Sequence, residues 1–509
     1  MTAYVVRRLL ASLLILLAAS FVMFALVSLS GDPLSEFYAS SDPDRELKIE
    51  SRIDALNLDE PFIVQYFLWL KGAAMCLVPG GGCDLGVNLQ NQEVTAVLAD
   101  AIPTTLRLVL AATVLAIVLG VAIGIISAIR QYSSFDYGIT FAAFLFFSLP
   151  IFWVAVLLKE FGAIRINDWL AEPAVTLPTA IVIGSFSALF FSALSGGSRK
   201  RKVLIGLGAG FAAVAIFIGL VASGWFKNPG MGPGIVIIGS VAGAVGATLL
   251  FTNLENRRVL FIAIGTAAIG VAVAYAGYPM LEDPTWLVLV GMGLLVTLVG
   301  VGIAYIWGSI DRAAAVRASV VTSFIVGFMV FLDHTISSFA SYSDSVNGRP
   351  FATIGSNTPN YQGTFWEVTL DTATHLVLPT LAIMLISFAG YSRYSRASML
   401  EVMNADYVRT ARAKGLTERT VVLRHAFRNA LIPIATLAAI DFGAVIAGAI
   451  ITETVFGWKG MGVIFTTAVE HFDYYQVMGV FVVTAIAVLV FNLIADISYA
   501  ILDPRIRLT

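Results

Sequence analysis

The residues best placed to bind a partner form one basic segment. Eight arginine and lysine residues lie between Arg393 and Arg428, around the single glycine Gly415. Guanidinium and ammonium groups at this density suit ion pairs with carboxylates on another protein. On charge alone, the segment is either a docking surface for a partner or a solvated basic loop.

The sequence around Gly415 predicts two short helices at an angle. A first helix over 407–414 would end on cations that suit the negative end of a helix, and Gly415 can adopt the left-handed conformation that stops it. Thr417 and Glu418 are typical of the cap and acidic first turn of a second helix, which would reach toward Asn429. Together the two helices would make a compact knob.

Asp441 is the one carboxylate that falls in the middle of a predicted membrane span. An acid at this depth indicates contact with a substrate amine on a transport pathway, a polar helix contact, or a span boundary placed wrongly. Glu453 and Asp496 fall near span ends, where a carboxylate can reach water, so we expect them to serve the fold.

Cysteine and histidine give little support to a metal site. Cys76 and Cys83 are the only cysteines, and they fit either a disulfide outside the membrane or two unpaired thiols. The four histidines show no ligand spacing, so we expect neither a metal site nor a catalytic site. They are His334, His375, His425 and His471.

The composition predicts an all-α polytopic membrane protein. Hydrophobic residues make up 58% of the 509 residues and charged residues only 13%, which excludes a soluble globule. Basic links such as 199–202 alternate with acidic segments, which places both termini in the cytoplasm. The predicted spans are 9–29, 104–129, 137–160, 176–194, 203–223, 235–252, 259–279, 285–308, 318–332, 376–397, 430–452 and 477–500.

The basic segment resembles the cytoplasmic EAA-type loop of ABC importer permeases, in the dipeptide and oligopeptide branch. The run DYVRTARAKGL is followed, nine residues after its glycine, by a match to HAxRNALIP. Arg409 begins the triplet that replaces Glu-Ala-Ala, a departure usual in this branch. Other matching segments, in order, are YVVRRLL, GDP, LNLDEPFIVQY, DLGV, IPTTLRL, SLPIFW, HLVLP, ITETVFGWKGMG and DISYAILDPRIR.

The resemblance implies a division of the chain into three parts. Residues 1–160 and 375–509 would be the two halves of a six-helix permease core, with an extracytoplasmic segment over 30–103 and a coupling loop over 398–429. Residues 161–374 depart from the pattern and would be an insertion of about six further spans. Small-residue spacings there, at Gly206 and Gly210 and at 291–293, favour close helix packing over a second transport pathway.

The resemblance also implies partners for this chain. It has no GxxxxGK[ST] phosphate loop, so ATP and Mg would bind to two separate ATPase subunits, and the chain itself would bind no cofactor and be no enzyme. A second permease and an extracytoplasmic substrate-binding protein would complete the importer in a prokaryotic cell membrane. Membrane lipid would surround the chain, and no nucleic acid would bind to it. The implied ATPase-coupling residues are Asp406, Tyr407, Arg409, Ala411, Arg412, Lys414, Gly415, Leu416, His425, Arg428 and Asn429.

Three other functions compete with peptide import. Permeases with similar sequences serve nickel chelates, sugars and other small solutes, because specificity largely resides in the binding protein. A proton-coupled secondary transporter would use Asp441, but it predicts inverted repeats and several buried acids, which we do not find. A signalling or scaffolding assembly that acts through the insertion is the third.

Overall fold

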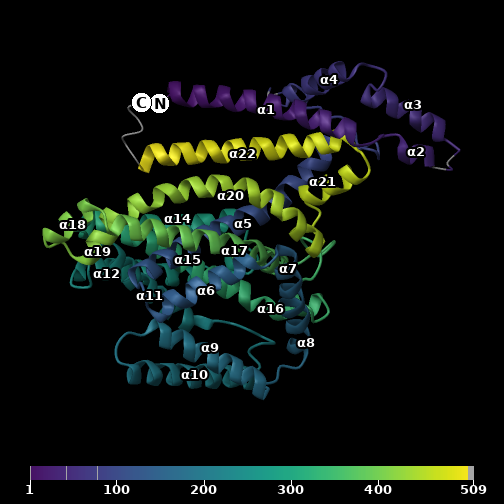
Figure 1. The fold of residues 1–509 in the computed structure, drawn as a ribbon. Coiled ribbons are helices and arrows are strands. Elements are labelled where there is room, and N and C mark those ends of the chain that lie inside the picture. Colours follow the sequence, from purple (N-terminus) through teal and green to yellow (C-terminus); the bar gives the residue numbers. More distant parts are fainter. Residues whose placement is uncertain (1, 40, 42, 77, 79, 503–509) are drawn as a thin grey trace. The chain divides into compact units, whose positions relative to one another are not determined.

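The computed structural model describes residues 2–39, 41, 43–76, 78 and 80–502 (Figure 1). In this part of the chain the named elements are all helices, and the β-type pairing is one isolated bridge between Val87 and Glu93. The predicted all-α class is therefore confirmed. The end of the DISYAILDPRIR segment, from residue 503 onward, lies outside the described residues.

The helices agree with the predicted membrane spans. Ten helices of the described chain are long and apolar enough to cross a membrane, and the bent pair over Ser134–Ser148 and Ile151–Ala171 makes an eleventh candidate. A further helix, α20 (Phe427–Phe456), covers the predicted span 430–452. The ten are α1 (Thr2–Ser30), α5 (Val94–Ile129), α9 (Leu177–Leu194), α10 (Arg199–Ala222), α11 (Gly232–Phe251), α12 (Arg257–Ala276), α14 (Trp286–Trp307), α15 (Arg312–Ser337), α17 (Phe365–Met403) and α22 (Tyr474–Leu502).

The predicted span over 137–160 is a bent pair of helices and not one continuous helix. Helix α6 (Ser134–Ser148) and the helix that begins with α7 (Ile151–Lys159) meet at an angle of 102°. Pro150 causes the break, because a proline pushes the residue before it out of the helical conformation, and Leu149 has an extended ψ of 130°.

The chain divides into two compact units. The first holds Met1–Gly162, Thr353–Ser356 and Leu376–Thr509, and the second holds Ala163–Ala352 and Asn357–His375. In the first unit the short elements are α2 (Ser35–Ala39), α3 (Arg45–Leu56), α4 (Phe62–Met75), α18 (Asp406–Ala413), α19 (Glu418–Thr420), the π-helix η3 (Val421–Ala426) and α21 (Met461–Glu470). In the second they are α8 (Arg165–Ala171), α13 (Tyr278–Leu281), η2 (Ser309–Asp311) and α16 (Phe339–Ser345), and a π-helix, η1 (Glu160–Ile164), lies at the division.

The predicted extracytoplasmic segment forms a packed layer of the first unit. Tyr66 of α4 is buried against Phe24 of α1, and the Tyr66 hydroxyl lies 2.9 Å from Ser20 Oγ. A disulfide joins Cys76 and Cys83, and within the loop that it closes residues 77 and 79 lie outside the described part of the chain.

A buried ion pair also holds the extracytoplasmic segment. Arg52 of α3 and Asp473, just before α22, are each 4% exposed, and Arg52 Nη2 lies 3.1 Å from Asp473 Oδ1. Arg52 Nη1 donates to the carbonyl oxygens of Val87 and Asn88, and Asp473 Oδ2 accepts from the Leu89 amide at 2.7 Å. These bonds fix α3 to the start of α22, although 421 residues separate the paired side chains.

Within the first unit, the end of the first long stretch of chain meets the start of the last one. A Cβ placed on Gly162 would lie 2.8 Å from Leu378 Cδ2. Gly162 is therefore in close contact with the Leu378 side chain of α17, so residues 162 and 378, which are 216 positions apart in the sequence, are neighbours in this unit.

Close helix packing through small residues is confirmed in one of the two predicted places in the second unit. A Cβ on Gly206 would lie 2.7 Å from the Ala188 carbonyl oxygen, and one on Gly210 would lie 2.7 Å from the Gly184 carbonyl oxygen. Helices α9 and α10 thus approach through their backbones. The prediction is wrong at Gly291 and Gly293, where an added Cβ would meet no atom within 4 Å.

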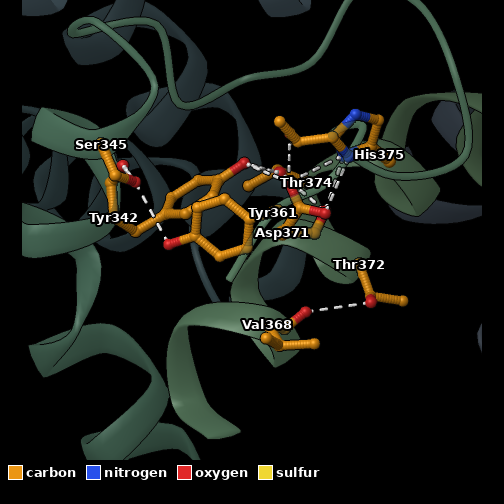
Figure 2. A network of polar contacts seen from close by, with 9 residues as sticks. Tyr342, Ser345, Tyr361, Val368, Asp371, Thr372, Thr374 and His375 are labelled. Atoms are coloured by element: carbon orange, nitrogen blue, oxygen red, sulfur yellow. Dashed lines mark hydrogen bonds and ion pairs between the residues drawn. The ribbon is translucent and has the colours of Figure 1, made fainter. Parts of the chain in front are cut away.

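A polar network joins α16 to the first turns of α17 in the second unit (Figure 2). Asp371 is 3% exposed, and its carboxylate accepts from the Tyr342 hydroxyl at 3.1 Å and the Thr358 hydroxyl at 2.6 Å. His375 Nδ1 lies 2.8 Å from the Asp371 carbonyl oxygen. The network satisfies a buried carboxylate, which would otherwise be costly.

Candidate functional site

The predicted helix before Gly415 is confirmed to within one residue. Helix α18 runs over Asp406–Ala413, and Gly415 has a φ of +77° in the left-handed region. The Gly415 amide donates to the Arg412 carbonyl oxygen at 2.9 Å, which closes the turn. A Cβ at this position would meet nothing within 4 Å, so the torsion angle, and not a neighbouring atom, requires glycine here.

The cap of the second helix is confirmed, but its extent is wrong. The Thr417 side chain accepts from the Thr420 amide, as predicted. The chain then continues from α19 through the π-helix η3 into α20, without a break near Asn429. His425 lies in the π-helical segment and is half-buried. The part of the loop after Gly415 is therefore the first part of a long membrane helix, and not a second short helix.

The apolar side of α18 packs on its own chain. Val408 and Ala411 are buried, and they belong to one cluster with Val421, Val422 and Ala426 of η3. Ala411 was among the implied ATPase-coupling residues. Its methyl group faces the interior of this chain, and its role in coupling stays a prediction.

Two side-chain contacts lock the loop. Arg412 Nη2 donates to Glu418 Oε1 at 2.7 Å and Arg412 Nε to Glu418 Oε2 at 3.1 Å, across the Gly415 turn. Asn429 Nδ2 donates to the Tyr407 hydroxyl at 2.8 Å. Arg412 was expected to pair with an acid of a partner, but its guanidinium pairs with Glu418 of this chain.

The Arg412–Glu418 pair predicts a small pH dependence. Its hydrogen bonds to Arg412 lower the pKa of Glu418. The pair therefore stabilises the loop at pH values above the ordinary pKa of glutamate, and this contribution is lost as the pH falls through the lowered pKa. Because both side chains are largely exposed, Arg412→Ala should cost below about 1 kcal/mol at pH 7. Thermal unfolding of wild type and Arg412→Ala between pH 7 and pH 2 measures it, and a difference that does not shrink as the pH falls contradicts it.

The exposed part of the loop is polar and basic. Arg409 has a side chain that is 66% exposed, at 3.9 Å from the fully exposed Asp406 carboxylate. Lys414, Leu416 and Arg428 are also exposed. We call these exposed side chains, with Gly415 between them, the basic face.

Two family models match the chain in sequence order. The model of the binding-protein-dependent transport system inner membrane component matches residues 318–508, which include the whole loop, and the model of the N-terminal part of these membrane components matches residues 1–109. Together they cover more than half of the chain. The chain belongs to this family. It is a permease subunit of an ABC importer, and ATP hydrolysis takes place on separate subunits.

Curated relatives of the permease are named for peptide transport. An oligopeptide transport system permease protein of Mycobacterium tuberculosis is 26% identical over 509 residues, and one of Bacillus subtilis is 25% identical over 512 residues, each across the full length of both chains. A dipeptide transport system permease protein of Escherichia coli is 42% identical over 138 residues, which are 27% of this chain and 41% of that protein.

A buried ion pair between α6 and α17 of the permease was not predicted from the sequence. Asp136, at the start of α6, is 2% exposed and accepts from Arg396 of α17 through Nε at 2.7 Å and Nη2 at 2.9 Å. Its carboxylate also accepts from Ser127 Oγ at 2.5 Å and from the Tyr132 amide at 3.0 Å. Ser133 caps α6 and accepts from the Asp136 amide. A serine followed three residues later by an acid is typical of a helix start, and this was the signal in the sequence that could have drawn attention to Asp136.

Glu453 serves the fold, as expected, but it does so from a buried position and does not reach water. Its side chain is fully buried, and it accepts from Thr105 Oγ1 at 2.6 Å, from the Gly462 amide at 2.9 Å and from the Val463 amide at 3.3 Å. Thr105 Oγ1 in turn accepts from the Met461 amide at 2.8 Å. Glu453 therefore organises the turn between α20 and α21. By contrast, Asp496 pairs with Arg8 at 3.0 Å.

Asp441 lies in α20 as predicted and is half-buried. Its Oδ2 atom is buried, and within the described residues it has no hydrogen-bond partner. Gly443 is on a packed part of the helix, since a Cβ there would lie 3.3 Å from Val488 of α22. A role for Asp441 on the pathway stays a prediction. Within the described chain, no three side chains of His, Cys, Asp or Glu lie together as metal ligands.

Proposed function

We propose that this permease forms, with a second homologous permease, the pathway by which a prokaryotic cell imports dipeptides or oligopeptides. The names of the curated relatives support the peptide substrate. Two ATPase subunits with ATP and Mg would act on the cytoplasmic side, and an extracytoplasmic binding protein would deliver the peptide. Both termini would lie in the cytoplasm, where the basic links of the chain gather under the positive-inside rule.

The observation that carries this proposal is the basic face on a well-braced loop. Helix α18 is packed on its inner side and locked by two side-chain contacts, while Arg409 and Lys414 project unburied. A preorganised cationic surface binds an acidic groove without paying to order the loop first. We propose that this face docks on an ATPase subunit, and that residues 161–374 are an insertion that packs within the membrane.

Reversing one charge on the basic face tests the docking. The variant Arg409→Glu should reach the membrane but lose most of its ATPase subunits, because it places a carboxylate against an acidic groove. Native mass spectrometry of the gently purified complex measures the number of ATPase copies, with two expected for wild type.

The matched control is Arg258→Glu, which makes the same charge change on an exposed basic link of the second unit. It should keep both ATPase copies. If Arg409→Glu also keeps both copies, the basic face is not the docking surface. If wild type itself purifies alone, the importer assembly is wrong as proposed.

A further inference from the structure

Helix α5 carries a polar joint near each end. The inner joint is the Asp136 carboxylate, which binds Ser127 of α5 and Arg396 of α17. The outer joint is Thr105 of α5, which binds the Glu453 carboxylate and the Met461 amide. Both joints are buried, and all of their members belong to the first unit.

The joints are separated by the thickness of a membrane. The 22 residues from Thr105 to Ser127 span about 33 Å of helix, close to the hydrocarbon thickness of a bilayer. The proline inside α5, Pro103, precedes Thr105 and so lies beyond the stretch between the joints. That stretch therefore has no proline hinge and can act as one rigid rod.

Near the inner joint, α5 is in backbone contact with α17. A Cβ on Gly120 would lie 2.5 Å from Tyr391 Cβ, and one on Gly124 would lie 2.5 Å from the Ser392 carbonyl oxygen. Two helices in such close contact cannot slide past each other without repacking. Helix α17 ends at Met403, three residues before α18 begins. The basic loop is therefore joined directly to α17, the helix against which α5 packs.

At the outer joint, Thr105 is linked to the turn that follows α20. Glu453 accepts from the amides of Gly462 and Val463, so its carboxylate ties the first turn of α21 to α20. The backbone of Gly460 packs directly against the Glu453 carboxylate, because a Cβ on Gly460 would lie 2.2 Å from Glu453 Oε1. A shift of α5 along its axis would leave buried hydrogen-bonding groups unsatisfied unless this turn moved with it.

We propose that α5 transmits the movement of the basic loop to the turn between α20 and α21, with Asp136 and Thr105 as positioning residues at its two ends. This inference rests on the proposed docking of the loop on an ATPase subunit. It assigns a function to two hydroxyl–carboxylate contacts, Ser127 with Asp136 and Thr105 with Glu453. It also makes the conformation of the turn at residues 457–463 depend on the ATPase cycle.

The test uses the full transporter with its binding protein in proteoliposomes, supplied with a dipeptide and with an oligopeptide. The variants are Thr105→Val, Asp136→Asn and the pair together. Peptide imported per ATP hydrolysed should fall at least about fivefold in each single variant, the lower end of typical coupling between sites, while basal ATP hydrolysis persists. Because both joints belong to one rod, the double variant should lose no more than the worse single variant.

The control is Thr104→Val, because among the described residues the Thr104 hydroxyl bonds within its own helix, to the Asp100 carbonyl oxygen at 3.5 Å. It should leave the ratio unchanged. Glu453→Gln is a second variant of the outer joint that keeps the side-chain size, and it should behave as Thr105→Val does. A merely structural role would lower assembly and Tm but would not change peptide imported per ATP in the complexes that remain.

Two results would overturn the inference. One is an unchanged ratio in Thr105→Val and Glu453→Gln, and the other is a multiplicative loss in the double variant, which would mean two independent contacts. The proposed function fails differently, through Arg409→Glu that keeps its ATPase subunits. A loss of ATPase subunits in Arg409→Glu together with an unchanged ratio in Thr105→Val would contradict the role of α5 and leave the proposed docking intact.

Discussion

Replacing Gly415 by proline is expected to abolish the stimulation of ATP hydrolysis by the loaded binding protein, while the permease still inserts. Proline fixes φ near −65°, whereas Gly415 has a φ of +77°, and it lacks the amide that donates to the Arg412 carbonyl oxygen. The turn between α18 and α19 must therefore open, because proline can neither adopt this torsion angle nor donate the hydrogen bond that closes the turn. ATP hydrolysis with and without peptide measures the loss.

Gly415→Asn is the matched control for that variant. Asparagine tolerates the left-handed conformation better than most residues, and a Cβ here would meet no atom within 4 Å. Stimulation should stay within about twofold of wild type, because the torsional penalty is of the order of 1 kcal/mol or less. Normal stimulation in Gly415→Pro would show that the geometry of this turn does not matter for coupling.

Arg52→Ala is expected to destabilise the permease more than the loss of an exposed ion pair would. It leaves the Asp473 carboxylate buried without its cation, and breaking a buried pair in this way costs about 3–5 kcal/mol. The extracytoplasmic segment should come loose from α22. Limited proteolysis of residues 43–60, together with Tm in detergent, measures both effects.

The comparison for Arg52→Ala is Arg8→Ala. Arg8 forms an ion pair of similar length with Asp496, but its side chain is 54% exposed, so its loss should cost about 1 kcal/mol or less. The double variant Arg52→Ala with Asp473→Ala should recover part of the loss, because no uncompensated charge remains. Equal effects of Arg52→Ala and Arg8→Ala would contradict the importance of burial.

Local sequence signals were sufficient for the first loop helix. Cations followed by a glycine indicate the end of a helix, and a threonine followed by a glutamate indicates the start of one. Both signals act within a few residues. The structure places the end of α18 and the Thr417 cap where these signals predict. Apolar runs likewise predicted the membrane helices, because the hydrocarbon core demands a length that any such run must meet.

Contacts between distant residues could not be predicted in this way. Glu453 was assigned to water because it lies near a helix end, but its partners are Thr105, which is 348 residues away, and amides of a turn whose path was unknown. Ala411 was assigned to a partner for the same reason: nothing local shows that η3 folds back against it. The continuation of the loop into α20 was also missed, since π-helical segments have no simple sequence signal.

The contact between Gly162 and Leu378 bears on how such a chain could arise. Where the backbone at one point packs against a side chain from a distant point, a segment can be added or removed between them with little change to what surrounds it, as in domain insertion generally. If residues 161–374 are an insertion, as proposed, a minimal version of this permease would join residue 162 to residue 376 by a linker that also takes the place of Thr353–Ser356 in the first unit.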